Sequence, residues 1–149
     1  MKIERANPSD HTTLTLITKE SKAYWGYSSE QMEAWSALLT ITPEYITKNE
    51  TYKLFSGDEI IGYYALVKID NQTLKLDNLF ILPEFIGKGF GKQMMADLFE
   101  RAASGNYTSV ILDADPNAES FYRKFGFVTI GQIETSIPNR SLPVMRRSL

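Results

Sequence analysis

The sequence predicts a mixed α/β fold, of the α+β kind, with a central sheet of about six to seven strands and about four flanking helices. Three observations support this. Short segments rich in β-branched and aromatic residues occupy the middle of the chain, apolar residues recur every three or four positions in other segments, and a glycine-rich loop leads from a strand into a helix. The expected order is strand, two helices, three strands, helix, strand, helix and two strands.

The length and composition indicate a single domain over residues 1–149. The chain has 149 residues, of which 43% are hydrophobic, so it can bury one substantial core but not two ordinary ones. No stretch of 18 consecutive apolar residues and no secretory leader is present, so we expect a cytoplasmic protein without a membrane partner.

Charge and residue usage exclude several kinds of site. The 16 basic and 18 acidic side chains give a formal net charge of -2, so we expect no nucleic-acid partner. The chain has no cysteine and a single histidine, His11, which excludes disulfides, thiolate or histidine metal sites and a cysteine nucleophile. We therefore expect no metal.

The first half of the chain is expected to hold one strand, two helices and three antiparallel strands. The strand covers Lys2 to Ala6 and the first helix runs from about Asp10 to Ser21. A capping pattern of Ser28 with Gln31 begins the second helix, whose apolar positions continue to Leu39 until Thr42-Pro43 stops it. The three strands are expected at Tyr52–Phe55, Ile60–Ile69 and Leu74–Leu82.

The second half is expected to start with a helix after the glycine-rich loop. Its apolar stripe includes Met94, Met95 and Leu98, which we interpret as core filling. Four further elements are expected: a strand at Val110–Leu112, a helix at Ala118–Phe125, a strand at Phe127–Ile133 and a last strand near Leu142–Arg146.

The glycine-rich loop is the most informative stretch of the sequence. Gly87, Gly89 and Gly91 alternate with other residues, so backbone N–H groups can converge on an anion where a helix begins. Lys88 and Lys92 add positive charge, and a pyrophosphate is the expected guest. Turn geometry alone is the alternative explanation. A dinucleotide-binding fingerprint fits less well, because the chain is too short for the parallel strand–helix–strand units of that fold.

Two segments together resemble the GCN5-related N-acetyltransferases. The first is Leu82-Pro83 followed by the glycine-rich loop, and the second is Asn117–Phe127, which reads NAESFYRKFGF. The resemblance covers nearly the whole chain and implies acetyl-CoA as cofactor and direct acetyl transfer to an amine. One departure is Ile86, where the family usually has Gln or Arg.

The resemblance also implies which residues bind coenzyme A. The pyrophosphate would lie on the loop, and the pantetheine arm would pair with the backbone at Leu79 and Ile81, whose side chains we expect in the core. Asn117 would hydrogen-bond the same arm, although an N-cap role is equally expected from its place before a helix. The implied loop residues are Gly87, Lys88, Gly89, Phe90, Gly91 and Lys92.

Two residues are candidates for proton transfer. By resemblance, the phenol of Tyr122 protonates the departing thiolate, and a phenol pKa of about 10 suits that task. A half-buried aromatic packing role is the alternative. Asp77 is a candidate base for the amine, through water, and Glu20 and Glu33 are further candidates. The family's usual glutamate aligns with Lys75, which cannot act as that base.

The acceptor is expected to be a small-molecule or peptide amine, which the sequence does not identify. Tyr24, Trp25 and Tyr27 lie where the family usually builds its acceptor pocket, and they can line such a pocket or fill the core. The segment 136–143 can cover the acceptor site or form the edge of a homodimer. The main alternative function is a non-catalytic acyl-CoA sensor, and the third is a dinucleotide-binding protein.

Overall fold

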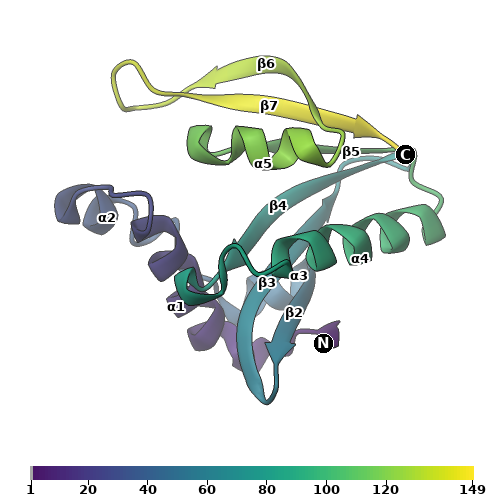
Figure 1. The fold of residues 1–149 in the computed structure, drawn as a ribbon, viewed down its shortest axis with the longest axis horizontal. Helices are drawn as coiled ribbons and strands as arrows, with labels where there is room; N and C mark the ends of the chain where they lie inside the picture. The colour runs from purple at the N-terminus through teal and green to yellow at the C-terminus, as the bar shows by residue number, and fades with distance from the viewer. Residues whose placement is uncertain (1) are drawn as a thin grey trace. The chain divides into compact units, whose positions relative to one another are not determined.

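The computed structural model describes residues 2–149, which form seven β-strands and five α-helices (Figure 1). Hydrogen-bonded neighbours in the sheet follow the order β1-β2-β3-β4-β5-β7-β6. The predicted mixed α/β fold is confirmed, with five helices in this part of the chain where about four were expected.

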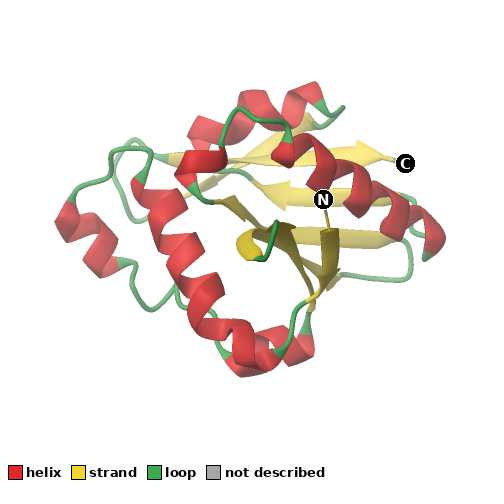
Figure 2. Ribbon diagram, turned by 60° about the horizontal axis from the view of Figure 1, so that its bottom comes forward, coloured by secondary structure: helices red, strands yellow, loops and turns green. Residues whose placement is uncertain are grey.

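The strand positions agree with the predicted ones to within a few residues. The strands are β1 (Lys2–Arg5), β2 (Glu50–Ser56), β3 (Glu59–Lys68), β4 (Thr73–Ile81), β5 (Ser109–Asp113), β6 (Val128–Glu134) and β7 (Ser141–Ser148). The α-helices, red in Figure 2, are α1 (His11–Ala23), α2 (Ser29–Ala34), α3 (Pro43–Lys48), α4 (Phe90–Ser104) and α5 (Glu119–Lys124). Three short 3-10 helices are η1 (Pro8–Asp10), η2 (Pro83–Phe85) and η3 (Pro116–Ala118).

The chain forms two compact units. The first contains the described residues up to Leu66 together with Asn78–Asp97, and the second contains Val67–Asp77 and Leu98–Leu149. The glycine-rich loop therefore belongs to the first unit, and the segment around Tyr122 belongs to the second.

In the first unit, two buried tyrosines of β3 attach helices to the sheet. Neighbouring residues of a strand point to opposite faces, so Tyr63 and Tyr64 extend in opposite directions. The Tyr63 hydroxyl shares a 2.5 Å hydrogen bond with Thr18 of α1, and the Tyr64 hydroxyl donates to Asp97 of α4 at 2.5 Å. Both rings are fully buried, so each hydroxyl needs such a partner. The two bonds place α1 and α4 against opposite faces of β3.

The prediction of one long second helix is wrong. Helix α2 starts as expected, because the Ser28 hydroxyl accepts a hydrogen bond from the Gln31 N–H at 3.1 Å, but it ends at Ala34. The pair Thr42-Pro43 then begins α3 and does not end a helix. The Thr42 hydroxyl caps the Tyr45 N–H at 3.0 Å, and proline is favourable at the first position of a helix, where no N–H is needed.

In the second unit, β7 lies between β5 and β6. Strand β5 pairs in parallel with the start of β4, Thr73–Lys75 against Ser109–Ile111, and antiparallel with β7. Strands β6 and β7 form an antiparallel hairpin, and Figure 1 shows α5 beside it. Met145 of β7 and Phe127, just before β6, are both buried.

The apolar stripe of α4 is core, as predicted. Met94, Met95 and Leu98 have no exposed surface. Two adjacent methionines can both be buried because an unbranched side chain fills irregular gaps between layers. The start of α4, and with it the end of the glycine-rich loop, is therefore fixed by buried packing one turn further along the helix.

Candidate active site

The glycine-rich loop follows β4 through one short 3-10 turn. The Leu82 N–H donates to Ile61 O at 2.8 Å, which holds the end of β4 on the sheet, and η2 follows. After Ile86 the chain turns through Gly87, with φ of 81°, and Gly89, with φ of 87°. Helix α4 begins at Phe90. Side chains with a Cβ rarely adopt such positive φ values, so both positions favour glycine.

Conformation, and not space, explains the two glycines. A Cβ built on Gly87 or Gly89 meets no atom within 4 Å. Gly91 differs, because it lies inside α4 and is absent from the set of positive-φ glycines. The three glycines look equivalent in the sequence, but Gly87 and Gly89 are turn residues and Gly91 is a helical residue.

The start of α4 can bind an anion. The first N–H groups of any α-helix have no intrahelical acceptor and carry a partial positive charge. Lys88 and Lys92 are exposed beside them, and the Lys88 ammonium lies 5.6 Å from the Phe85 ring centroid. The side chain of Ile86 is 41% exposed, so the family's departure at this position leaves an aliphatic group at the surface. The 3-10 helix η2 separates β4 from the glycines. In a dinucleotide-binding fingerprint the glycines lie in the tight turn directly after the strand.

Side chains alternate between the two faces of β4, so every second residue from Lys75 to Ile81 lies on one face. Leu74 and Leu76 point to the other face and are buried. Leu79 and Ile81 are only half-buried, so the expectation that their side chains are core is wrong. They share their face with the two polar residues Lys75, whose ammonium pairs with Asp113 at 3.1 Å, and Asp77, whose side chain is exposed.

Asn117 does not cap α5. The residue before α5 is Ala118, which provides no side-chain cap. Asn117 lies inside η3, and the cap of η3 is Asp115. The Asp115 Oδ1 accepts hydrogen bonds from the backbone N–H and the side-chain Nδ2 of Asn117, both at 2.9 Å. Arg140 of the β6–β7 turn pairs with the other carboxylate oxygen, Oδ2, at 3.4 Å.

Tyr122 is buried on α5, with 8% of its surface exposed. Its ring packs edge-on against Phe121 at 5.2 Å and against Phe127 at 5.8 Å. Burial raises the pKa of the Tyr122 phenol well above its ordinary value, and the negative charge of Asp115 raises that pKa further. The phenol carries its proton at neutral pH, as an ordinary tyrosine does, and the raised pKa makes it a weaker acid than an exposed tyrosine.

The aromatic residues between α1 and α2 form two separate pairs. Tyr24 and Trp25 pack edge-on at 5.2 Å and are 52% and 41% exposed. Tyr27 packs against Trp35 at 4.8 Å, and the ammonium of Lys22 lies 5.4 Å and 5.2 Å from those two ring centroids. The first pair is thus available at the surface, while the second already contacts a cation of this chain.

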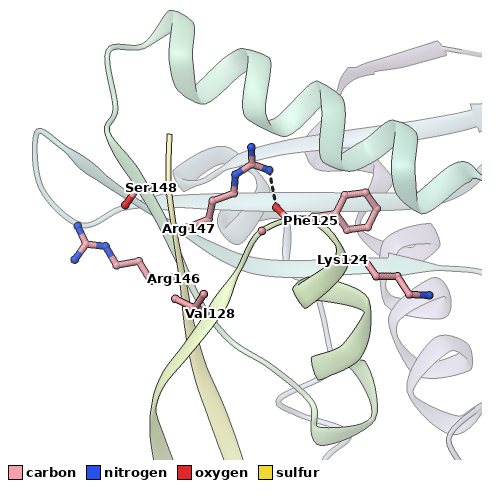
Figure 3. A pocket seen from close by; sticks show the side chains of 7 residues that line it. Lys124, Phe125, Val128, Arg146, Arg147 and Ser148 are labelled. Atoms are coloured by element: carbon pink, nitrogen blue, oxygen red, sulfur yellow. Dashed lines mark hydrogen bonds between the residues drawn. The ribbon is translucent and has the colours of Figure 1, made fainter.

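The second unit also has a shallow pocket of about 770 Å³. Figure 3 shows that the Lys124 and Arg146 side chains extend away from each other, while Arg147 donates to Phe125 O at 2.5 Å. The cations do not converge on one point, so this hollow is not a candidate active site. Its lining contains neither Asn117 nor Tyr122 and consists of Lys124, Phe125, Gly126, Val128, Arg146, Arg147 and Ser148.

Residues 2–149 offer neither a metal-binding cluster nor a membrane-spanning helix. No group of three or more His, Cys, Asp or Glu side chains in this range is placed to hold a metal ion. None of the helices in the same range has the length and hydropathy that crossing a bilayer requires.

Sequence reasoning missed two polar residues of this region, Asp115 and Arg140. Asp115 had a readable signal, because Asp before Pro often starts a helical turn. Arg140 had none, since its pairing with Asp115 joins residues 25 positions apart in the chain.

Comparison with known proteins supplies the family. The model of the acetyltransferase (GNAT) domain matches residues 23–136. The uncharacterized N-acetyltransferase YvbK of Bacillus subtilis is 32% identical over 90 residues, which are 58% of this chain and 58% of that protein. The uncharacterized N-acetyltransferase ycf52 of Gracilaria tenuistipitata var. liui is 25% identical over 61% of this chain and 50% of its own. The matched region thus spans about half the length of these curated relatives.

Solved structures support the fold. The PaiA N-acetyltransferase of Thermoplasma acidophilum, solved in complex with coenzyme A, matches with a TM-score of 0.82 at 21% identity, over 99% of this chain and 98% of that one. A GNAT family acetyltransferase of Elizabethkingia anophelis, solved with acetyl-CoA bound, matches with a TM-score of 0.69 at 20% identity, over 99% and 97%. With the family model covering most of the sequence, the chain belongs to the GNAT acetyltransferase family.

Proposed function

We propose that this chain is an acetyl-CoA-dependent N-acetyltransferase that transfers the acetyl group directly to an amine. The observation that carries the proposal is the left-handed turn at Gly87 and Gly89, which opens α4 in a chain of this family. The coenzyme A and acetyl-CoA complexes of the Thermoplasma and Elizabethkingia proteins support the same cofactor here. We further propose that residues 1–149 act as one N-acetyltransferase domain, since the family model includes parts of both units.

The cofactor-binding groups in this proposal are mostly backbone. N–H groups between Gly87 and Lys92 bind the pyrophosphate, and the β4 backbone at Leu79 and Ile81 pairs with the pantetheine arm. The half-buried side chains at these two β4 positions are consistent with that role. Asn117 adds a side-chain hydrogen bond to the arm. Acetyl-CoA supplies an activated acetyl group as a thioester.

Tyr122 and Asp77 move the protons in this proposal. A protonated amine with a pKa of about 10.4 cannot attack, and its deprotonation at neutral pH costs about 4 to 5 kcal/mol. Asp77, exposed on β4, takes this proton through water. Tyr122 donates its phenol proton to the departing thiolate. No enzyme thioester can form, because the chain has no cysteine.

Tyr24 and Trp25 are proposed to contact the acceptor. Both rings are exposed and packed edge-on, so they offer an apolar surface and a ring face to an amine. Tyr27 is proposed to line the same surface, with its ring beside Lys22. Cytoplasmic location stays a prediction from the sequence.

The test of the proposed function is thiol release from acetyl-CoA across a panel of small amines, polyamines, amino acids and peptides. We expect release above the acceptor-free background with at least one amine, with equimolar acetylated product by mass spectrometry. Binding of acetyl-CoA without release for any acceptor would support the sensor instead. A melting temperature raised by NAD and not by acetyl-CoA would contradict both functions.

Replacement of the Tyr122 hydroxyl should affect chemistry and leave binding intact. With the best acceptor from the panel, Tyr122→Phe should lower kcat by about 100-fold, the lower range for a lost general acid. The Kd for acetyl-CoA should stay within about twofold, because the ring and its packing remain. Tyr107→Phe removes the hydroxyl of a half-buried tyrosine elsewhere in the second unit and is the matched control. Equal kcat in the two variants would overturn the role of Tyr122.

We also propose that the chain forms a homodimer through the edge strand β6. The other edge strand, β1, is short and reads Lys-Ile-Glu-Arg, which protects it with charge. Strand β6 reads Val-Thr-Ile-Gly-Gln-Ile-Glu, and Val128, Ile130 and Ile133 are 60%, 58% and 43% exposed. Antiparallel pairing of two β6 strands places the Val128 end of one copy beside the Glu134 end of the other. Arg146, which pairs with Val128 on β7, then lies near the acidic Glu134 of the other copy.

Light scattering tests this assembly. We expect twice the monomer mass for the unchanged protein and the monomer mass for Ile130→Lys, because a charge on the edge opposes pairing. Leu38→Lys, at an 81% exposed position of the first unit, should remain dimeric. A monomeric unchanged protein at high concentration would rule the dimer out.

A further inference from the structure

Asp115 lies at the centre of a polar cluster in the second unit, just before η3. Its Oδ1 accepts two hydrogen bonds from Asn117, one from the backbone N–H and one from Nδ2, both at 2.9 Å. Its Oδ2 faces the Arg140 guanidinium at 3.4 Å. The side chains of Asp115 and Arg140 are 12% and 15% exposed, so this ion pair is shielded from water much more than a surface pair.

Arg140 reaches Asp115 from an internally bonded turn. The Thr135 hydroxyl donates to Arg140 O at 2.7 Å, and the Arg140 N–H donates to Ile137 O at 3.2 Å. Asn139 adopts a positive φ of 62°, which a short polar residue tolerates. The turn between β6 and β7 thus fixes the backbone that carries the guanidinium.

The chemistry of Asp115 fixes the orientation of the Asn117 carboxamide. An ionised carboxylate accepts hydrogen bonds and donates none, so the edge of the amide that faces it must be the NH₂ group. The carbonyl oxygen of Asn117 then lies on the opposite edge. Without the carboxylate, the amide loses the acceptor that favours this orientation over the one rotated by half a turn, which would present a donor in place of the carbonyl oxygen.

We infer that Asp115, held by Arg140, is a positioning residue that orients the Asn117 carbonyl oxygen to accept a hydrogen bond from an amide N–H of the cofactor arm. This inference rests on the proposed function, since Asn117 is there a cofactor-binding residue. Asp115 contacts no cofactor in this scheme and acts only through Asn117.

The competing explanation is that Asp115 merely caps η3. A cap stabilises the fold whether or not residue 117 has a carboxamide, so its loss should change the melting temperature equally in either background. An orienting role requires the carboxamide. The two explanations therefore differ in the coupling between positions 115 and 117, which a double-mutant cycle measures.

The experiment is a calorimetric titration with acetyl-CoA of the unchanged protein, Asp115→Asn, Asn117→Ala and the double variant. Asp115→Asn should weaken binding by about three- to tenfold, the effect of one misplaced hydrogen bond. The same change made on top of Asn117→Ala should alter the Kd by less than twofold. Equal weakening in both backgrounds, or no weakening by either single change, would overturn the inference.

Two further variants keep the result interpretable. Arg140→Gln retains both Asn117 bonds to Asp115 but loosens the carboxylate, and it should weaken binding only when Asn117 is present. This variant replaces Asp115→Asn if that protein does not fold. Glu119→Gln is the matched control, because it neutralises a nearby carboxylate that accepts hydrogen bonds from Thr129 at 2.6 Å and Arg123 at 3.1 Å. Its Kd should stay within twofold of the unchanged protein.

Failure of the inference is distinct from failure of the proposed function. If the unchanged protein does not bind acetyl-CoA, the proposed function and this inference are both wrong. If it binds, and the effects at positions 115 and 117 are independent, the function stands and the orienting role of Asp115 is wrong.

Discussion

The left-handed backbone at Gly87 and Gly89 is the constraint on which the proposed cofactor site depends. Each residue with a Cβ would cost about 1 to 2 kcal/mol in this conformation. No neighbouring atom crowds either position, so the requirement comes from the direction of the chain. The turn starts α4 at Phe90, and Met94 and Met95 then reach the core one turn later. Buried packing and the first N–H groups of α4, which have no intrahelical acceptor, thus belong to the same short segment.

The second unit supplies the groups that need side chains. Tyr122 packs among phenylalanines, and its burial raises the pKa of the phenol, so the proton that it would donate is held more tightly than in an exposed tyrosine. The carboxylate of Asp115 acts in the same direction on that phenol and also bonds Asn117. One charged residue therefore influences two neighbouring polar groups, and its own charge is balanced by Arg140.

Local sequence patterns predicted most of this fold, and they failed where the decision depended on tertiary contacts. The strands, α4 and α5 were predicted because apolar periodicity and flanking glycines agreed. The end of α2 was not, since its apolar pattern continues to Leu39 while the helix stops at Ala34. Thr42-Pro43 can stop one helix or start another, and here it starts α3. In the site, family motifs pointed to Asn117 and Tyr122, but the Asp115–Arg140 pair joins distant segments and has no local signature.

The most direct test of the account compares Gly89→Ala with Gly57→Ala by titration with acetyl-CoA. Both glycines have a positive φ, of 87° and 61°, and a Cβ at either meets no atom within 4 Å, so the two changes impose a similar backbone cost. Gly57 lies in the β2–β3 turn and is not part of the glycine-rich loop. If the loop backbone binds the pyrophosphate, Gly89→Ala should weaken acetyl-CoA binding by about tenfold, while Gly57→Ala should leave the Kd unchanged. Equal affinities in the two variants would contradict the account.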